Sequence, residues 1–467
     1  MMGIDQPQEE LLDYQVNPAK RVRTDSPLRR INVNKSSILT ALLVCTITGT
    51  ALLNSCCPSS KTCRLGQEQA TELPPQEHIS IPIANIEISA KNYMHNLDLI
   101  RQIIGPDVKL CAVMKADAYG LGVENLAPYV VASEPDYIAA INNSEFWILR
   151  KEILKQKKDI SLLRIAPVVR DELIESIENG LNIEEIIGSP GEAKMISETA
   201  GELSEKLGRN VTVNVHVNIE TGIGRMAFRN TDEIREAIKL PHLKLKGAMT
   251  HFANAYEKEP AATEKTKKQT EIFDRVVAEL NFDKSVIRHI ANSAATVKYP
   301  WARKDMVRVG TLTYGAEIEG LDPDNEIRPV LIGYKSMVAI IEDNVPPGSP
   351  IGYDSLESTN SRYPSTTATV RVGYSDGLPE MAFKQGIKVL IRGQKFPLLG
   401  KTSMNLAVVD ITDQDKNNPI QLGDEVVIIG KQGEEEISIE EFASQCNYVV
   451  TDMIIYLGSV TKRKVVE

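Results

Sequence analysis

The residues best suited to chemistry stand directly after short apolar runs of the chain. The first is Lys115, which ends the run in "AVMKADAYGLG" (residues 112–122). A lysine amine among apolar residues gives up its proton more easily than a solvated one, and it can then attack a carbonyl carbon to form a Schiff base. Taken alone, a lysine that ends a strand is more often a surface residue whose ammonium reaches water.

Other polar groups follow later apolar runs in the same way. They are guanidinium groups, an imidazole, a hydroxyl and backbone amides, at Arg225, His251, Asn292, Ser293, Arg308 and Gly310. No pair of carboxylates and no cluster of metal-ligating residues joins them. A site rich in cations and hydrogen-bond donors suits an anionic ligand, most simply a phosphate. A lysine that reaches a phosphate-bearing aldehyde indicates pyridoxal phosphate, held as a Schiff base.

Eight short runs of β-branched or apolar residues precede these groups. They cover residues 109–115, 136–142, 161–166, 184–188, 211–219, 245–252, 287–292 and 306–315. Helical patterns such as residues 143–159 and 191–208 lie between most of them. Apolar strands that alternate with helices predict a parallel sheet, and eight repeats predict a (β/α)8 barrel over residues 81–330. A doubly wound open sheet is the alternative, but it has fewer units. The active site of such a barrel lies at the carboxyl ends of its strands, where the polar groups fall.

The pattern changes after about residue 330. Strand-like runs separated by Gly, Pro and Asp turns predict a β-rich second domain over residues 331–467, with few helices. The early strand at residues 84–89 precedes the barrel pattern, and we expect it to pair into that domain because chain ends often meet.

Length and composition set the class of protein. A chain of 467 residues, 42% hydrophobic and 25% charged, is typical of a soluble protein with two or three domains. The net charge of −10 argues against a nucleic-acid partner. The spacing of the six cysteines predicts no zinc site. For Cys111 and Cys446 two buried free thiols are favoured, and a disulfide between them is the alternative.

Residues 1–56 predict an export signal or an anchor. A basic stretch precedes "ILTALLVCTITGTALL" (residues 38–53), which has no charge over 16 residues. "LLNSC" then resembles a bacterial lipoprotein cleavage site before Cys56, although Asn54 departs from the usual small residue. Residues 57–80 read as a polar linker. We therefore expect a periplasmic protein that contacts the membrane only through this segment or through a lipid on Cys56.

Six stretches, in order along residues 84–467, resemble motifs of the alanine racemase family. They are "VMKADAYGLG", "HFANA", "IANSAAT", "RVGTLTYG", "VGYSDG" and "GKTSMN". The resemblance implies a pyridoxal phosphate enzyme that interconverts the L and D forms of free amino acids. It also implies a (β/α)8 barrel followed by a β-domain, in agreement with the strand pattern. Finally, it implies a head-to-tail homodimer in which each active site takes residues from the partner's β-domain.

The resemblance also implies a role for each matching residue. Lys115 would bind the cofactor and act as one acid/base, while Tyr374, from the partner subunit, would act on the opposite face. Racemisation needs this pair because one group removes the Cα proton and the other returns a proton from the other side. His251 would link Tyr374 to Arg308, and Arg308 would face the pyridine nitrogen. That nitrogen would stay neutral because a guanidinium keeps its proton.

The remaining matches would bind the cofactor or the substrate. The expected phosphate and cofactor contacts are Tyr119, His251, Asn292, Ser293, Arg308, Gly310 and Thr311. Arg225 would lie near the cofactor oxygen and the substrate carboxylate, and the backbone amide of Met404, from the partner subunit, would contact that carboxylate.

Three positions depart from ordinary alanine racemases. The family often has a carbamylated lysine seven residues before the arginine, where this chain has Asn218. Asn405 stands where an aspartate is usual, and Thr451 where an entrance-lining, phosphate-binding tyrosine is expected. The two asparagines together with the export signal resemble the broad-spectrum amino-acid racemases of the bacterial periplasm, which accept several amino acids, cationic ones included.

We therefore expect a broad-spectrum racemase that acts on lysine, arginine, alanine and methionine among others. A dedicated alanine racemase that carries neutral substitutions is the alternative. Two further alternatives are less favoured. A decarboxylase of basic amino acids needs a Gly-rich phosphate loop and a late catalytic cysteine, neither of which can be placed in the sequence. A non-catalytic carrier of pyridoxal phosphate would be a barrel alone.

Overall fold

The computed structural model describes residues 83–316, 320–322, 326–355 and 357–466. The predicted export signal or anchor (1–56), the linker (57–80) and Cys56 lie outside the described residues. The described residues belong to one compact unit. Within these ranges, no helix has both the length and the apolar character needed to cross a membrane.

Eight parallel strands of the described chain form the predicted barrel. They are β2 (Lys109–Val113), β3 (Tyr137–Ala140), β4 (Ser161–Arg164), β5 (Ile183–Ile187), β6 (Val213–Asn218), β7 (Leu243–Met249), β8 (Ile287–His289) and β9 (Met306–Val309). The strands pair in chain order from β2 to β8, and β9 pairs with the other side of β2. Between β8 and β9 the Arg308 N–H donates to the Ala291 carbonyl at 3.0 Å, so the barrel is nearly closed. This order confirms the (β/α)8 prediction over the doubly wound alternative.

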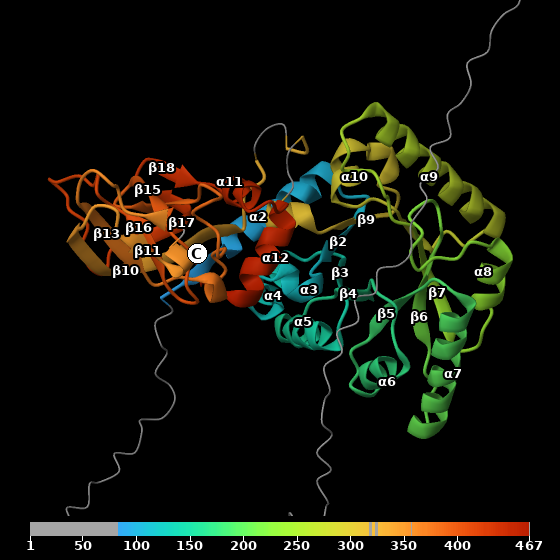
Figure 1. The fold of residues 1–467 in the computed structure, drawn as a ribbon. Coiled ribbons are helices and arrows are strands. Elements are labelled where there is room, and N and C mark those ends of the chain that lie inside the picture. Colours follow the sequence, from blue (N-terminus) through green and yellow to red (C-terminus); the bar gives the residue numbers. More distant parts are fainter. Residues whose placement is uncertain (1–82, 317–319, 323–325, 356, 467) are drawn as a thin grey trace, which may run out of the picture. The chain divides into compact units, whose positions relative to one another are not determined.

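Helices follow most of the strands, and Figure 1 shows α5 to α8 outside them. The helices are α2 (Ala90–Ile104), α4 (Val123–Ala132), α5 (Asn143–Gln156), α6 (Arg170–Glu178), α7 (Pro190–Leu207), α8 (Thr231–Ala237), α9 (Pro260–Leu280) and α10 (Ser293–Lys298). The ends of α7 show how sequence sets such bounds. Ser189 accepts a hydrogen bond from the Glu192 N–H, Pro190 takes the first position, and Gly208 ends the helix at φ 61°.

The β-domain is built on a large sheet whose order is β18-β17-β14-β15-β16-β13-β10-β1-β19. Its strands are β1 (Asn85–Ser89), β10 (Leu331–Val345), β13 (Ser365–Val370), β14 (Lys388–Ile391), β15 (Gln394–Leu399), β16 (Ala407–Asp410), β17 (Glu425–Gln432), β18 (Glu435–Ile437) and β19 (Lys462–Val466), and a separate hairpin pairs β11 (Pro350–Ile351) with β12 (Glu357–Ser358). Because β1 pairs with β10 and β19, the expectation for residues 84–89 is confirmed. Cys111 and Cys446 are buried and free, as predicted.

Two helices near the carboxyl end were not predicted, α11 (Ile439–Gln445) and α12 (Val450–Val460). Figure 1 shows α12 beside the short turn α3 (Lys115–Tyr119), which follows β2. The approach is close, because a Cβ atom at Gly458 would lie 2.1 Å from the Gly120 carbonyl oxygen. The β-domain therefore packs directly against the end of the turn that carries Lys115. Short 3-10 turns complete the chain: η1 (Pro300–Ala302), η2 (Thr311–Tyr314), η3 (Tyr353–Ser355) and η4 (Tyr374–Asp376).

Candidate active site

The turn α3 carries Lys115 at its start and Tyr119 at its end. Its residues from Ala116 to Tyr119 all have φ between 53° and 55°, in the left-handed region. None of the four is glycine, and each such residue costs about 1–2 kcal/mol relative to the right-handed conformation. The surrounding structure must hold this turn in place, since the local sequence does not favour it.

The expected phosphate site gathers around Tyr119 and Gly310. A Cβ atom at Gly310 would lie 2.2 Å from Tyr119 Oη, so only glycine allows this approach. Ser293 begins α10, and its Oγ accepts a hydrogen bond from the Gly310 N–H at 3.0 Å. Thr311 begins η2, and its hydroxyl lies 2.6 Å from the Tyr256 hydroxyl. Hydroxyl groups and backbone therefore gather where a phosphate is expected.

Asn292 has a structural role beside this group. Its Oδ1 accepts a hydrogen bond from the Ala295 N–H at 3.0 Å, so the side chain caps α10. The cap orients Ser293, the next residue, toward Gly310. The structure thus gives Asn292 a supporting position.

Four cationic or basic groups gather near the turn. Burial, and then the Arg225 guanidinium, lower the pKa of Lys115. Burial, and then Arg308, Arg225 and Lys115, lower the pKa of His251 to about 3, so its imidazole is neutral at physiological pH. Across the described ranges, no carboxylate forms an ion pair with Lys115, Arg225 or Arg308. Such an excess of positive charge fits an anionic ligand.

Arg308 lies at one end of a buried chain of hydrogen bonds inside the barrel. Its Nη1 lies 3.0 Å from His289 Nδ1, and His289 Nε2 lies 2.8 Å from His216 Nδ1. His216 Nε2 lies 2.7 Å from Glu184 Oε2. A guanidinium only donates and a carboxylate only accepts, so every bond runs from Arg308 toward Glu184 and both histidines are neutral with the proton on Nε2.

The pKa shifts agree with this chain of hydrogen bonds, which we call the relay. Burial, and then Arg308, hold the pKa of His289 well below its ordinary value. Burial lowers the pKa of Arg308 to about 10, so the guanidinium keeps its proton at neutral pH. Arg308 also donates from Nη2 to the Thr250 carbonyl at 2.8 Å and lies 3.4 Å from His251 Nδ1. Its orientation is thus fixed from two sides.

Asn218 ends β6 and holds the segment that carries Arg225. Its Nδ2 donates to the Met226 carbonyl at 2.7 Å. Gly188 adds a close contact, because a Cβ atom there would lie 2.0 Å from the same carbonyl oxygen. The Asn218 amide therefore contacts the backbone of the segment that carries Arg225.

A second group of expected site residues lies in the β-domain. The Tyr374 N–H donates to the Ser403 carbonyl at 3.1 Å, and the Ser375 hydroxyl donates to the Met404 carbonyl at 2.7 Å. Asn405 Nδ2 donates to the Ser375 hydroxyl at 2.6 Å. The side chains of Tyr374 and Met404 are 41% and 56% exposed in the single chain. Among the described residues, no hydrogen bond or ion pair joins this group to Lys115.

Thr451 lies in the first turn of α12. Its Oγ1 is buried and has no hydrogen-bond partner among the described residues. The alignment that sets Thr451 where the family has a tyrosine stays a prediction. Within the described ranges, no group of His, Cys, Asp or Glu side chains has the arrangement of a metal site.

Two family models match most of the chain. The alanine racemase N-terminal domain matches residues 88–318, and the alanine racemase C-terminal domain matches residues 332–465. The chain belongs to the alanine racemase family. Membership confirms the predicted class of enzyme, an amino-acid racemase, and its cofactor, pyridoxal phosphate.

Individual relatives align with most of the chain. An alanine racemase of Syntrophobacter fumaroxidans is 32% identical over 80% of this chain and 95% of the relative. A broad specificity amino-acid racemase of Vibrio parahaemolyticus is 31% identical over 85% of this chain and 92% of the relative. The fold matches the solved alanine racemase of Clostridium difficile 630 with a TM-score of 0.69 at 30% identity, over 81% of this chain and 94% of that one. The alanine racemase of Bartonella henselae, solved with covalently bound pyridoxal phosphate, matches with a TM-score of 0.68 at 24% identity, over 82% of this chain and 99% of that one.

The residues of this chain fit that cofactor. Unpaired cations suit its phosphate, a lysine with a lowered pKa suits its aldehyde, and the Tyr119–Gly310 approach leaves no room for a larger residue. Sequence reasoning missed the relay of Glu184, His216 and His289. The available signal was a glutamate or histidine inside three of the predicted strand runs, at Glu184, His216 and His289.

Proposed function

We propose that the protein is a broad-spectrum amino-acid racemase in which Lys115 and Tyr374 exchange protons with the two faces of Cα. When bound, the cofactor supplies an aldehyde and an electron-withdrawing ring that make the Cα–H bond of an attached amino acid acidic. The observation that carries the proposal is the group of Lys115, Arg225, His251 and Arg308, which has no carboxylate partner in the described chain.

Three residues of that group have specific tasks. Burial and Arg225 lower the pKa of Lys115, so its amine loses a proton more easily and can then accept one. Arg225 holds the substrate carboxylate, and Asn218 holds its segment through the Met226 carbonyl. Arg308 would face the pyridine nitrogen and keeps its own proton, because burial lowers its pKa only to about 10. A ring nitrogen left neutral would draw electrons weakly, which would favour simple proton return over side reactions.

The second base comes from another copy of the chain. The group of Tyr374, Met404 and Asn405 is exposed on the β-domain of the single chain, and Leu406 beside it is 40% exposed. A homodimer with shared active sites would cover this group and would place Tyr374 of the partner subunit opposite Lys115. Free amino acids are the substrates.

Substitution of Tyr374 tests the two-base mechanism. The change Tyr374→Phe removes the phenol oxygen and keeps the ring, so racemisation should be lost while the visible absorbance of the lysine-bound cofactor stays. Full activity of this variant would remove Tyr374 from the mechanism.

Mixed dimers test the sharing of active sites. Lys115→Ala and Tyr374→Phe chains are each inactive alone under this proposal. When the two chains are unfolded together and refolded, roughly half of the dimers are mixed and one of their two sites is intact, so roughly a quarter of the activity should return. Inactivity of the mixture would mean that each site is built within one subunit.

The breadth of substrates rests on this chain's own residues. The named relatives include an alanine racemase at 32% identity and a broad specificity racemase at 31%, so identity alone does not separate the two functions. Asn218, Asn405 and Thr451 support the broad-spectrum function. Asn218 contacts the backbone of the Arg225 segment directly, so the chain differs from a carbamylated site beside the residue that would hold the substrate carboxylate. A dedicated alanine racemase is the second candidate.

We also propose that the enzyme works in the periplasm. The support is the uncharged run at residues 38–53 after a basic stretch. Cell fractionation tests the compartment. The mass of the mature amino terminus separates a lipid on Cys56 from an uncleaved anchor.

A further inference from the structure

We propose that Glu145 is a positioning residue that holds the left-handed turn of Lys115 and Tyr119 in its active shape. The proposal deepens the proposed function and rests on it in one respect, the binding of the cofactor to Lys115. The turn has four consecutive residues with positive φ, and none of them is glycine. A conformation that the local sequence disfavours needs contacts from elsewhere in the fold.

Glu145 supplies such a contact from the first turn of α5. Its Oε1 accepts a hydrogen bond at 2.7 Å from the backbone N–H of Asp117, in the middle of the left-handed turn. Its Oε2 accepts from the N–H groups of Ile141 at 2.9 Å and Asn142 at 3.0 Å. The side chain is buried. One carboxylate therefore joins the turn after β2 to the loop after β3.

The chemistry of this position requires a carboxylate. Backbone donors face both of its oxygens, and a carboxylate accepts on both sides. An amide has one acceptor oxygen, so a glutamine would turn an NH2 group toward an N–H donor. A buried donor left without an acceptor is costly, and the Asp117 amide has no other acceptor among the described residues.

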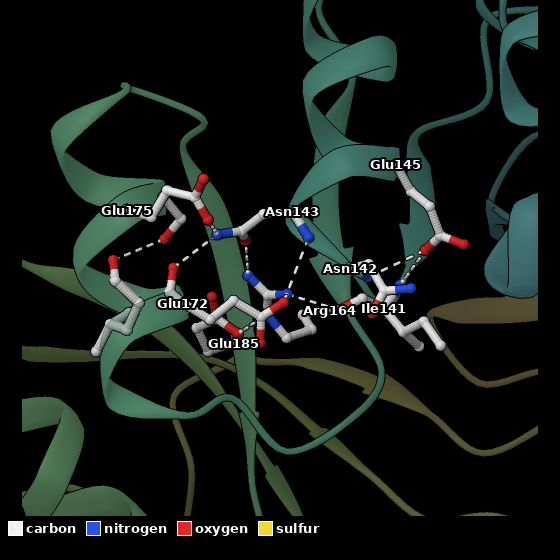
Figure 2. A network of polar contacts seen from close by, with 10 residues as sticks. Ile141, Asn142, Asn143, Glu145, Arg164, Glu172, Glu175 and Glu185 are labelled. Atoms are coloured by element: carbon white, nitrogen blue, oxygen red, sulfur yellow. Dashed lines mark hydrogen bonds and ion pairs between the residues drawn. The ribbon is translucent and has the colours of Figure 1, made fainter. Parts of the chain in front are cut away.

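Behind Glu145 a buried ion-pair network fixes the loop after β3 (Figure 2). Arg164 lies at the end of β4, and its Nη1 donates to the Ile141 carbonyl at 2.6 Å. Its Nη2 donates to Asn143 Oδ1 at 2.7 Å, and its Nε donates to Glu185 at 2.9 Å. Figure 2 shows Glu145 and Arg164 on either side of Ile141. The loop is held at its carbonyl by Arg164 and at its N–H groups by Glu145.

The β-domain holds the same turn from the other side. Arg463 of β19 forms an ion pair with Asp117 and donates to the Gly120 carbonyl at 3.1 Å. The other carboxylate oxygen of Asp117 accepts from the Val123 N–H at 2.7 Å. The backbone of Asp117 is thus fixed by Glu145 and its side chain by Arg463.

Hydrogen–deuterium exchange of the Asp117 amide, in the full chain with and without pyridoxal phosphate, tests the proposal. The Glu145→Gln variant should exchange this amide about 10- to 100-fold faster, as expected for loss of a charge-assisted hydrogen bond. The Glu145→Asp variant keeps the charge but is one methylene shorter, so it also loses the bond to the Asp117 amide and should show the same faster exchange. It serves as the test if Glu145→Gln does not fold. The cofactor concentration for half-saturation should rise about tenfold in both.

Asp136→Asn is the matched control. Asp136 accepts from the Leu110 N–H at 2.9 Å, at the opposite end of β2. Its substitution also removes a carboxylate–backbone bond, but it should leave the Asp117 amide and cofactor binding unchanged. Unchanged exchange and cofactor binding in both Glu145 variants would overturn the proposal.

The same samples separate this proposal from the proposed function. Borohydride reduction traps the cofactor covalently on the lysine that holds it. Trapping on a lysine other than Lys115 would refute the proposed function, while the exchange rates without cofactor would still decide the role of Glu145.

Discussion

Glu185 of β5 gives a prediction about stability and pH. The side chain is 1% exposed, and Oε2 accepts from Arg164 Nε at 2.9 Å, while Oε1 is buried with no partner in the described chain (Figure 2). Burial raises the pKa of Glu185 from 4.5 to about 7, although Arg164 acts against it. We predict that Glu185→Gln removes a pH dependence of the free energy of unfolding.

The sign and the size follow from proton linkage. Below pH 4.5 the carboxyl is protonated in both the folded and the unfolded state, so the contribution of Glu185 to the free energy of unfolding is fully present. As pH rises toward 7, the unfolded chain releases the proton first, and the folded state loses stability relative to the Gln variant. A shift from 4.5 to about 7 corresponds to roughly 3 kcal/mol over this range.

Urea unfolding of both proteins between pH 4.5 and pH 8 measures this difference. Asp136→Asn serves as a control. Burial opposes ionisation of Asp136, but the Leu110 amide and Arg101 outweigh it and lower its pKa below 3.8. The contribution of Asp136 to stability is lost only as pH falls through its lowered pKa. The difference in free energy of unfolding between the wild type and Asp136→Asn should therefore stay constant above pH 4.5. A wild-type protein that gains stability over Glu185→Gln as pH rises would refute the reasoning, because Arg164 would then outweigh burial.

Three further predictions concern the cofactor and the chain of hydrogen bonds from Arg308 to Glu184. Gly310→Ala would set a methyl group 2.2 Å from Tyr119 Oη, so cofactor affinity should fall about tenfold in a fluorescence titration, and unchanged affinity would argue against this phosphate site. Glu184→Gln introduces a group that both donates and accepts, so the relay loses its fixed direction and kcat should fall about tenfold or more while cofactor binding stays. Nitrogen-15 NMR of the wild type should show the Nε2–H tautomer at both relay histidines, and an imidazolium at either would contradict the assigned direction.

Local patterns were enough to predict the barrel and the lysine turn as a site. Each barrel strand is a short apolar run bounded by turns, and Lys115 stands at the end of one. The left-handed shape of the turn could not be predicted, because Ala, Asp, Ala and Tyr carry no preference for positive φ. It arises from Glu145 and Arg463, which lie about 30 and about 350 residues away in the chain.

In the β-domain, local patterns gave the wrong expectation for the helix α12. Residues 450–460 contain paired β-branched residues, which are typical of strands, and the segment is nevertheless the helix α12. Packing against the lysine turn favours the helix, since Gly458 allows the Gly120 carbonyl to come close. The relay was missed for a related reason. Its members lie on three strands, and only the closed barrel brings them together.

The central claim is that one site formed by Lys115 and a partner tyrosine racemises several amino acids. The most direct measurement is the rate of conversion of L-alanine, L-lysine, L-arginine and L-methionine to their D forms by the full chain loaded with pyridoxal phosphate, in deuterium oxide. We predict conversion of all four, with one deuterium gained at Cα for each inversion. Conversion of alanine alone would contradict the broad-spectrum function, and inversion without deuterium gain would contradict proton exchange at Cα.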